Sequence, residues 1–145
     1  PREHRTALGD RIYGCDDCQT ACPFTRRRAA APSTAPTESS VDVLALLAAD
    51  DAEVMRRCDR WWVHGRDATW VRRNLLVVLG NTADPADPRV AAVLADSLVH
   101  PRAEVRAHAV WAAARLGLRG LLPVTDGHEM VRDELEHLPP LREPA

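Results

Sequence analysis

Three of the four cysteines in the chain, Cys15, Cys18 and Cys22, lie within eight residues, and Pro23 follows the last of them. Thiolates separated by two or three residues on a tight loop can converge on one metal centre without a regular helix or strand between them. Sulfur ligands also select iron-sulfur clusters or zinc over hard cations. The run therefore predicts a metal site.

The spacing of the run bears on which metal it binds. It ends with two cysteines three residues apart and a proline, as in bacterial ferredoxins, although one leading cysteine of the ferredoxin run is missing. Structural zinc usually needs a second short-spaced Cys or His pair, and neither Cys58 nor the six histidines supplies one. Clustered cysteines without a signal peptide suggest a reducing compartment, which disfavours a disulfide. We expect a 4Fe-4S cluster, with zinc, a disulfide or inert thiols as the alternatives.

The number of cysteines bears on whether this chain could bind two clusters without ligands from another part of the protein. In two-cluster ferredoxins, the neighbouring cysteines bind one cluster, and the cysteine before the proline binds the second cluster. By that logic Cys15 and Cys18 bind one cluster, and Cys22 reaches a second. Two such clusters need more thiolates than the four cysteines present. We therefore expect this chain to be part of a larger protein.

The rest of the sequence predicts a mainly α fold. A short helical turn is expected at residues 2–8 and is ended by Gly9. Apolar periodicity and end signals indicate further helices at 41–47, 51–58, 68–79, 88–98, 101–116 and 126–138. The expected start signals are Ser39, Ser40, Asp50, Asp67, Asp87, Pro101 and Asp126, and the expected stops are Gly80-Asn81 and Gly117.

Two of these helices carry an internal repeat. Residues 71–77 align with 105–111 at an offset of 34 residues, and both segments begin with Val-Arg. This period, with two helices per unit, is typical of a HEAT-like array. We expect a ferredoxin-like cluster loop at residues 1–25, a linker at 26–40 and an α-α HEAT-like repeat domain at 41–145. Cys58, Trp70 and Trp111 are expected in the core of that domain.

Hydropathy and charge limit the possible partners. No apolar run approaches the roughly 20 residues that a membrane span needs, so we expect no membrane partner and a cytoplasmic protein. The formal net charge of −2 argues against a uniformly basic nucleic-acid binder. Any contact with RNA would therefore need a local patch.

Residues 9–19, GDRIYGCDDCQ, together with Cys22-Pro23-Phe24, are similar to the second cluster motif of epoxyqueuosine reductase. That family performs the last step in making queuosine at the tRNA wobble position. The resemblance implies a cobalamin, two 4Fe-4S clusters, an external electron donor and C-terminal helical repeats. It also implies that the cobalamin domain and the catalytic acid belong to an N-terminal reductase part. No catalytic residue is therefore assigned within this sequence.

The repeated segments supply candidate contacts to the tRNA anticodon stem-loop. The candidates are Arg72, Arg73, Asn74, Arg106 and His108. Arginine can bind phosphates, and Asn or His can read a base edge or a ribose. The Val-Arg arginines have a second interpretation, which is bonding to acidic groups or carbonyls between repeats. In that case they would be unavailable to RNA.

Three functions remain open from the sequence. The favoured one is the C-terminal segment of an epoxyqueuosine reductase. The second is a non-enzymatic HEAT-like scaffold that binds protein or RNA. The third is a small iron-sulfur electron carrier, which would require Cys58 as its fourth ligand.

Overall fold

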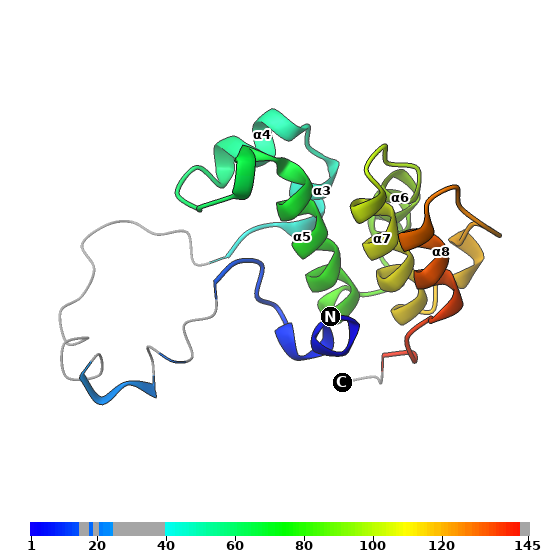
Figure 1. The fold of residues 1–145 in the computed structure, drawn as a ribbon, viewed down its shortest axis with the longest axis horizontal. Coiled ribbons are helices and arrows are strands. Elements are labelled where there is room, and N and C mark those ends of the chain that lie inside the picture. The colour runs from blue at the N-terminus through cyan, green and yellow to red at the C-terminus, as the bar shows by residue number, and fades with distance from the viewer. Residues whose placement is uncertain (15–17, 19–20, 25–39, 143–145) are drawn as a thin grey trace.

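The computed structural model describes residues 1–14, 18, 21–24 and 40–142, and within these ranges the regular structure is helical (Figure 1). The mainly α class is thereby confirmed, while the ferredoxin-like loop and the HEAT-like assignment stay predictions. The α-helices are α3 (Val43–Ala48), α4 (Asp51–Arg57), α5 (Ala68–Thr82), α6 (Pro88–Leu98), α7 (Ala103–Arg115) and α8 (Glu129–Glu136). Four 3-10 turns accompany them in the described ranges: Arg2–His4, Thr6–Leu8, His64–Arg66 and Arg119–Leu121. None of the helices in the described ranges has the length and apolarity to span a membrane.

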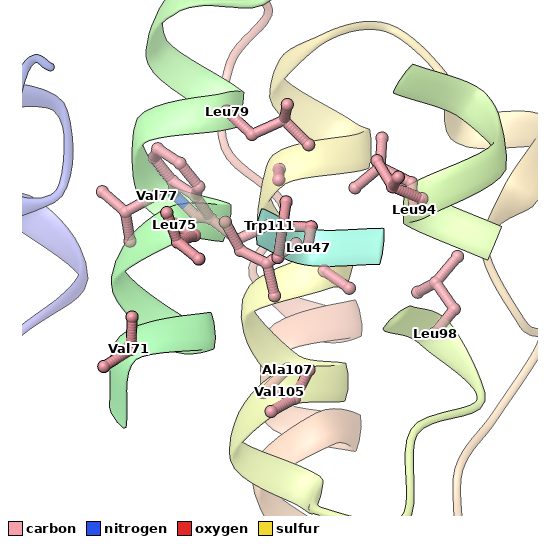
Figure 2. Packing of buried hydrophobic residues seen from close by; sticks show 14 of the residues in the cluster. Leu47, Val71, Leu75, Val77, Leu79, Leu94, Leu98, Val105, Ala107 and Trp111 are labelled. Atoms are coloured by element: carbon pink, nitrogen blue, oxygen red, sulfur yellow. The ribbon is translucent and has the colours of Figure 1, made fainter. Parts of the chain in front are cut away.

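Helix α7 lies at the centre of the fold and contacts α5, α6 and α8, while α3 and α4 pack on α5. Figure 2 shows Leu47 of α3, Leu75 of α5 and Leu94 of α6 directed toward α7 and its Trp111. Trp111 is 1% exposed, which confirms its expected core position. Each large side chain buried in this way contributes roughly 1.5–3 kcal/mol. Helix α7 is rich in buried alanine, and these small side chains let several helices approach it.

The structure corrects the predicted end of the helix at 68–79, because α5 continues through Gly80 and Asn81 to Thr82. A Cβ atom at Gly80 would lie 2.6 Å from Trp111 Cζ3 and 3.1 Å from the Ala112 Cα. Glycine is needed here for the close approach of α5 to α7 and does not act as a helix stop. A glycine that ends a helix and a glycine that permits close helix packing give the same pattern in the sequence, so the prediction of a helix end was wrong.

Most other helix ends follow the expected chemistry. Asp50, Asp67 and Asp87 accept backbone hydrogen bonds as N-caps of α4, α5 and α6. Gly117 has a φ of 79°, and the N–H of Leu118 donates to the Ala113 carbonyl oxygen at 2.9 Å. This left-handed glycine ends α7 as predicted.

Three predicted starts are wrong. The cap of α3 is Asp42, whose carboxylate accepts from the Ala45 N–H at 3.1 Å; Ser40 precedes it, and Ser39 lies outside the described residues. Helix α7 begins at Ala103, two residues after Pro101. Helix α8 begins at Glu129 with His128 as its cap; Asp126 lies in the preceding loop, where its carboxylate binds Arg106 and accepts from the His128 N–H at 2.8 Å.

The repeated arginines hold the turns between helices. Arg72 of α5 is 7% exposed, and its guanidinium donates to the carbonyl oxygens of Leu47 (2.9 Å) and Ala49 (2.5 Å) and to Asp51 Oδ1 (2.8 Å). These atoms belong to the α3–α4 turn. The single side chain therefore fixes that turn against α5 and satisfies carbonyls that the end of α3 leaves unpaired.

Arg106 of α7 occupies the corresponding position of the repeat. It donates to Asp126 Oδ2 at 2.8 Å, to Asp126 Oδ1 at 2.9 Å and to the His100 carbonyl oxygen at 2.8 Å. The bidentate pair joins α7 to the loop before α8, and the bond to His100 holds the turn before α7. Such charge-assisted pairs are the stronger kind of hydrogen bond. The Arg106 hydrogen bond lowers the pKa of Asp126 to about 2.

We expect Gly80→Ala to destabilise the fold. The new methyl group must displace the Trp111 ring, at an overpacking cost of about 1–3 kcal/mol, which the higher helix propensity of alanine offsets by about 1 kcal/mol. Urea unfolding would show a lower midpoint. Gly127→Ala is the control, since nothing lies within 4 Å of its added Cβ, and it should leave the midpoint nearly unchanged. Equal midpoints for Gly80→Ala and wild type would contradict the close-packing role.

Arg72→Met should lower the free energy of unfolding by about 2–4 kcal/mol, because the buried carbonyls of the α3–α4 turn lose their donor. Arg89→Met is the matched control. Its guanidinium pairs with Asp87 at the surface, with 68% of the Arg89 side chain exposed, so a loss below about 1 kcal/mol is expected. Chemical denaturation of both variants measures the difference, and similar losses would argue against the buried role of Arg72.

The Arg106–Asp126 pair predicts a pH dependence of stability. The folded-state pKa of Asp126, about 2, lies below its ordinary value of 3.8. The pair's contribution to the free energy of unfolding is therefore fully present above pH 3.8 and is lost as the pH falls toward 2. Asp126→Asn should cost roughly 1–2 kcal/mol near neutral pH. Denaturation at a series of pH values should show the two proteins converging in acid; a constant difference would contradict the assignment.

Candidate functional site

The segment before the cysteine run is fastened to α5. Asn74 Nδ2 donates to the Ile12 carbonyl oxygen at 2.8 Å, and Asn81 Nδ2 donates to the carbonyl oxygens of Arg5 (2.9 Å) and Gly9 (3.0 Å). In Figure 1 this N-terminal segment, in blue, lies beside the C-terminal end of α5. The expected helical turn at 2–8 is present as two 3-10 turns. The chain therefore enters the cysteine run from a defined position.

Two arginines fasten the same segment to α8. Glu134 is only 2% exposed, and its Oε1 accepts from Arg5 Nη1 at 2.8 Å and from Arg2 Nε at 3.1 Å. Arg2 also pairs with Asp133. The Arg5 guanidinium lies 5.6 Å from the ring centroid of Trp111. Sequence reasoning missed these contacts, because no local pattern pairs the first residues of a chain with its last helix.

A charged cleft of about 710 Å³ lies where the N-terminal segment meets α5, α7 and α8. It is lined by Pro1, Arg2, Glu3, His4, Arg5, Leu8, Arg73, Asn74, Val77, His108, Met130, Asp133 and Glu134. The structure thus brings together Arg73, Asn74 and His108, three of the five candidate RNA contacts. Arg72 and Arg106 do not line this cleft, because their guanidinium groups bind the turns described above.

Arg73 is a half-buried cation in the cleft. Its Nε and Nη2 donate to Asn74 Oδ1 at 3.2 and 3.1 Å, and its guanidinium lies 5.3 Å from the ring centroid of Trp70. No carboxylate contacts it within the described part of the chain. Burial, and then the charge of Arg5, lower the pKa of Arg73. An anion that reached Arg73 would therefore meet a cation without a carboxylate partner, whereas Arg2 and Arg5 of the same cleft are already paired with Asp133 and Glu134.

His108 supplies a neutral polar group. Its Nδ1 lies 2.8 Å from the Glu104 carbonyl oxygen, and because a carbonyl only accepts, Nδ1 carries the proton. Burial, followed by the charge of Arg5, lowers the pKa of His108 to about 3. The ring is therefore uncharged near neutral pH, and Nε2 is left as a hydrogen-bond acceptor suited to a hydroxyl or amino group.

The cysteines differ in their surroundings. Cys15 lies outside the described residues, Cys18 is exposed and Cys22 is half-buried. These thiols are soft donors of the kind that iron-sulfur clusters or zinc take, so the donor set fits the predicted metal centre. The searched part of the chain contains no group of three or more His, Cys, Asp or Glu side chains placed to hold a metal ion.

Cys58 does not fit a role as fourth ligand. It is 2% exposed at the end of α4, within the apolar core, as expected. Burial raises the pKa of its thiol, whereas a metal ligand must be a thiolate. This observation disfavours the self-contained electron carrier.

A second hollow, the aromatic pocket, has a volume of about 360 Å³ and includes residues that precede the cysteine run. It is lined by Ile12, Tyr13, Trp61, Trp62, Val63, His64, Trp70, Val71, Arg73 and Asn74. Tyr13 stacks on Trp61 with ring centroids 4.9 Å apart and planes 4° apart. Trp70, which was expected in the core, is partly buried against it. The pocket was missed because Tyr13 is distant from these residues in sequence.

Comparison with known proteins gives one consistent result. No family model and no solved structure matches the chain. A protein of Xanthomonas campestris named epoxyqueuosine reductase is 36% identical over 122 residues, which are 81% of this chain and 34% of the relative. One of Bacillus subtilis with the same name is 31% identical over 81% of this chain and 31% of its own length. A third, from Vibrio cholerae, is 34% identical over 62% of this chain and 25% of the relative.

The chain thus spans about a third or less of the length of these relatives. The matched region covers most of the 145 residues. The similarity expected from the cysteine motif is therefore confirmed by the wider sequence. Over about four fifths of its length, this chain is similar to proteins named epoxyqueuosine reductase, and it corresponds to about a third of their length.

Proposed function

We propose that this chain is the C-terminal part of an epoxyqueuosine reductase-like enzyme of queuosine biosynthesis. The observation that carries the proposal is the 31 to 36% identity, over about four fifths of the chain, to relatives with that name. The reaction reduces epoxyqueuosine to queuosine at the wobble position of tRNA, in the cytoplasm. Cobalamin, when bound to the N-terminal reductase part, supplies the reducing chemistry. This chain contributes cluster ligands and a surface for the tRNA.

We assign the cluster ligands as the cysteine motif suggests. Cys15 and Cys18 hold one 4Fe-4S cluster, and Cys22 reaches a second one shared with the N-terminal part. The thiolates bind iron and, through their hydrogen bonds and solvent exposure, set the potential at which electrons from the external donor pass. The hydrogen bonds from Asn74 and Asn81 to the preceding backbone support this assignment, because they hold the entry to the loop in place.

The tRNA anticodon stem-loop is assigned to the charged cleft. Arg73 offers a cation to a phosphate, and His108 Nε2 accepts from a ribose hydroxyl, a group that distinguishes RNA from DNA. Asn74 positions the Arg73 guanidinium through Oδ1. Arg72 and Arg106 contribute by holding the turns around α5 and α7, and direct RNA contact is not assigned to them.

The cluster assignment predicts split ligation. Anaerobic reconstitution should give little cluster iron or sulfide with this chain alone, and a stoichiometric cluster when the N-terminal reductase part of a relative is added. Cys18→Ala and Cys22→Ala should each lose cluster iron in the complex. Cys58→Ala should retain it, since that thiol lies in the core. Iron, zinc and sulfide analysis with a visible spectrum provides the measurement.

Three outcomes would contradict the proposal. A stable cluster in the isolated chain would show a self-contained electron carrier, and stoichiometric zinc would show a structural zinc site. Full cluster loading of the complex without restored reductase activity would favour the scaffold function for this chain. Activity restored by wild type and lost in Cys18→Ala would support the enzyme assignment.

A further inference from the structure

The aromatic pocket presents rings to solvent that a folded core would normally bury. Trp62 is 77% exposed and Tyr13 is 45% exposed, whereas Trp111 in the core is 1% exposed. The Trp62 and His64 rings lie at a tilted angle with centroids 6.2 Å apart. A volume of about 360 Å³ is within the range of sites for small planar ligands. The pocket thus offers aromatic surface that no residue in the described part of the chain covers.

The pocket is also held in shape before any ligand binds. The Tyr13 hydroxyl donates to the Trp62 carbonyl oxygen at 3.1 Å and accepts from the Trp62 N–H at 3.0 Å. The Tyr13 ring also stacks on the Trp61 ring, and this contact fixes the orientation of Tyr13. These contacts join the N-terminal segment to the loop after α4. A site fixed in this way loses little conformational entropy when a flat ligand enters.

The charge at the boundary between the aromatic pocket and the charged cleft indicates which planar ligand fits the pocket. Arg73 lines both the aromatic pocket and the charged cleft, so an aromatic group in the pocket can carry an anionic group toward its guanidinium. A nucleotide has this combination of a planar base and an attached phosphate. A peptide aromatic side chain lacks the anion, and a free phosphate lacks the ring.

The polar groups of the pocket point to binding without sequence discrimination. Asn74, the amide in its lining, already donates from Nδ2 to Ile12 and accepts at Oδ1 from Arg73. Its hydrogen-bonding capacity for a base edge is therefore largely used. Stacking on tryptophan or tyrosine tolerates every base, because each base has a π-face.

We infer that the aromatic pocket takes up one unstacked base of an RNA loop, stacked on Trp62 and Tyr13, with the adjoining phosphate at Arg73. The inference rests on the proposed binding of a tRNA stem-loop by this chain. It assigns to the chain a base-binding subsite outside the charged cleft. The base in it is held by stacking and is not identified by its edge.

The test uses the 145-residue chain and two RNA hairpins with the sequence of a tRNA anticodon arm. One hairpin is intact, and the other carries abasic sites at all loop positions. Three of the four tryptophans line the pocket, so quenching of tryptophan fluorescence reports occupancy, and fluorescence anisotropy of labelled RNA gives the affinity. Trp62→Ala is compared with wild type, with Trp62→Phe as the rescue variant and Val124→Ala, an exposed apolar control.

We expect Trp62→Ala to weaken binding of the intact hairpin by roughly 5- to 100-fold, the worth of one stacked base. Trp62→Phe should recover most of the affinity. For the abasic hairpin, Trp62→Ala and wild type should bind equally, which isolates the ring-to-base contact. Val124→Ala should match wild type on both hairpins, and circular dichroism should show that every variant is folded.

The experiment distinguishes failure of the pocket inference from failure of the proposed RNA binding. If wild type binds the intact hairpin and Trp62→Ala binds it equally well, the pocket inference fails while the proposed RNA binding stands. An equal loss on both hairpins also overturns the inference, because Trp62 would then act without a base. If wild type binds neither hairpin, the RNA-binding part of the proposed function fails, and the inference fails with it.

Discussion

The close packing of α5 against α7 at Gly80 is the contact on which the rest of the structure depends. The Trp111 ring and the Ala112 backbone occupy the space that any side chain at Gly80 would need. The absence of a side chain brings the two helices together, and α3, α6 and α8 then cover the remaining apolar faces. The cleft and the aromatic pocket both take residues from α5, so the position of this one helix determines the geometry of both hollows.

The repeat in the sequence serves the structure more than the site. Its two arginines, Arg72 and Arg106, bind carbonyl and carboxylate oxygens of neighbouring turns. The chemically available groups lie one or two residues further along, Arg73 in α5 and His108 in α7. A helix turns about 100° per residue, so residues close together in the sequence face different surroundings. One residue can therefore hold the turns between helices while a residue one or two positions later faces the cleft.

The N-terminal segment links the cysteine run to the helices. Its backbone is bound by Asn74 and Asn81, and its arginines meet Glu134 of α8. These bonds place the residues that precede the cysteine run beside both hollows. In the enzyme that we propose, the chain would consequently enter the cluster loop from a point fixed to the RNA-binding surface. Such coupling suits a reaction in which electrons must reach a base held in a fixed position.

The sequence by itself determined the mainly α class, the starts of α4, α5 and α6, the buried state of Cys58 and Trp111, and the similarity to the epoxyqueuosine reductases, because these depend on local patterns of apolar residues, caps and cysteine spacing. It also pointed to Arg73, Asn74 and His108. Only the tertiary structure decided that Gly80 is a packing site, that Asp126 binds Arg106 instead of starting a helix, and that Arg5 and Glu134 share a cleft. It also brought Tyr13 to Trp61 and Trp62. Each of these facts is a contact between residues far apart in the chain, and no local pattern records which distant side chain will fill the space beside a glycine, a carboxylate or a ring.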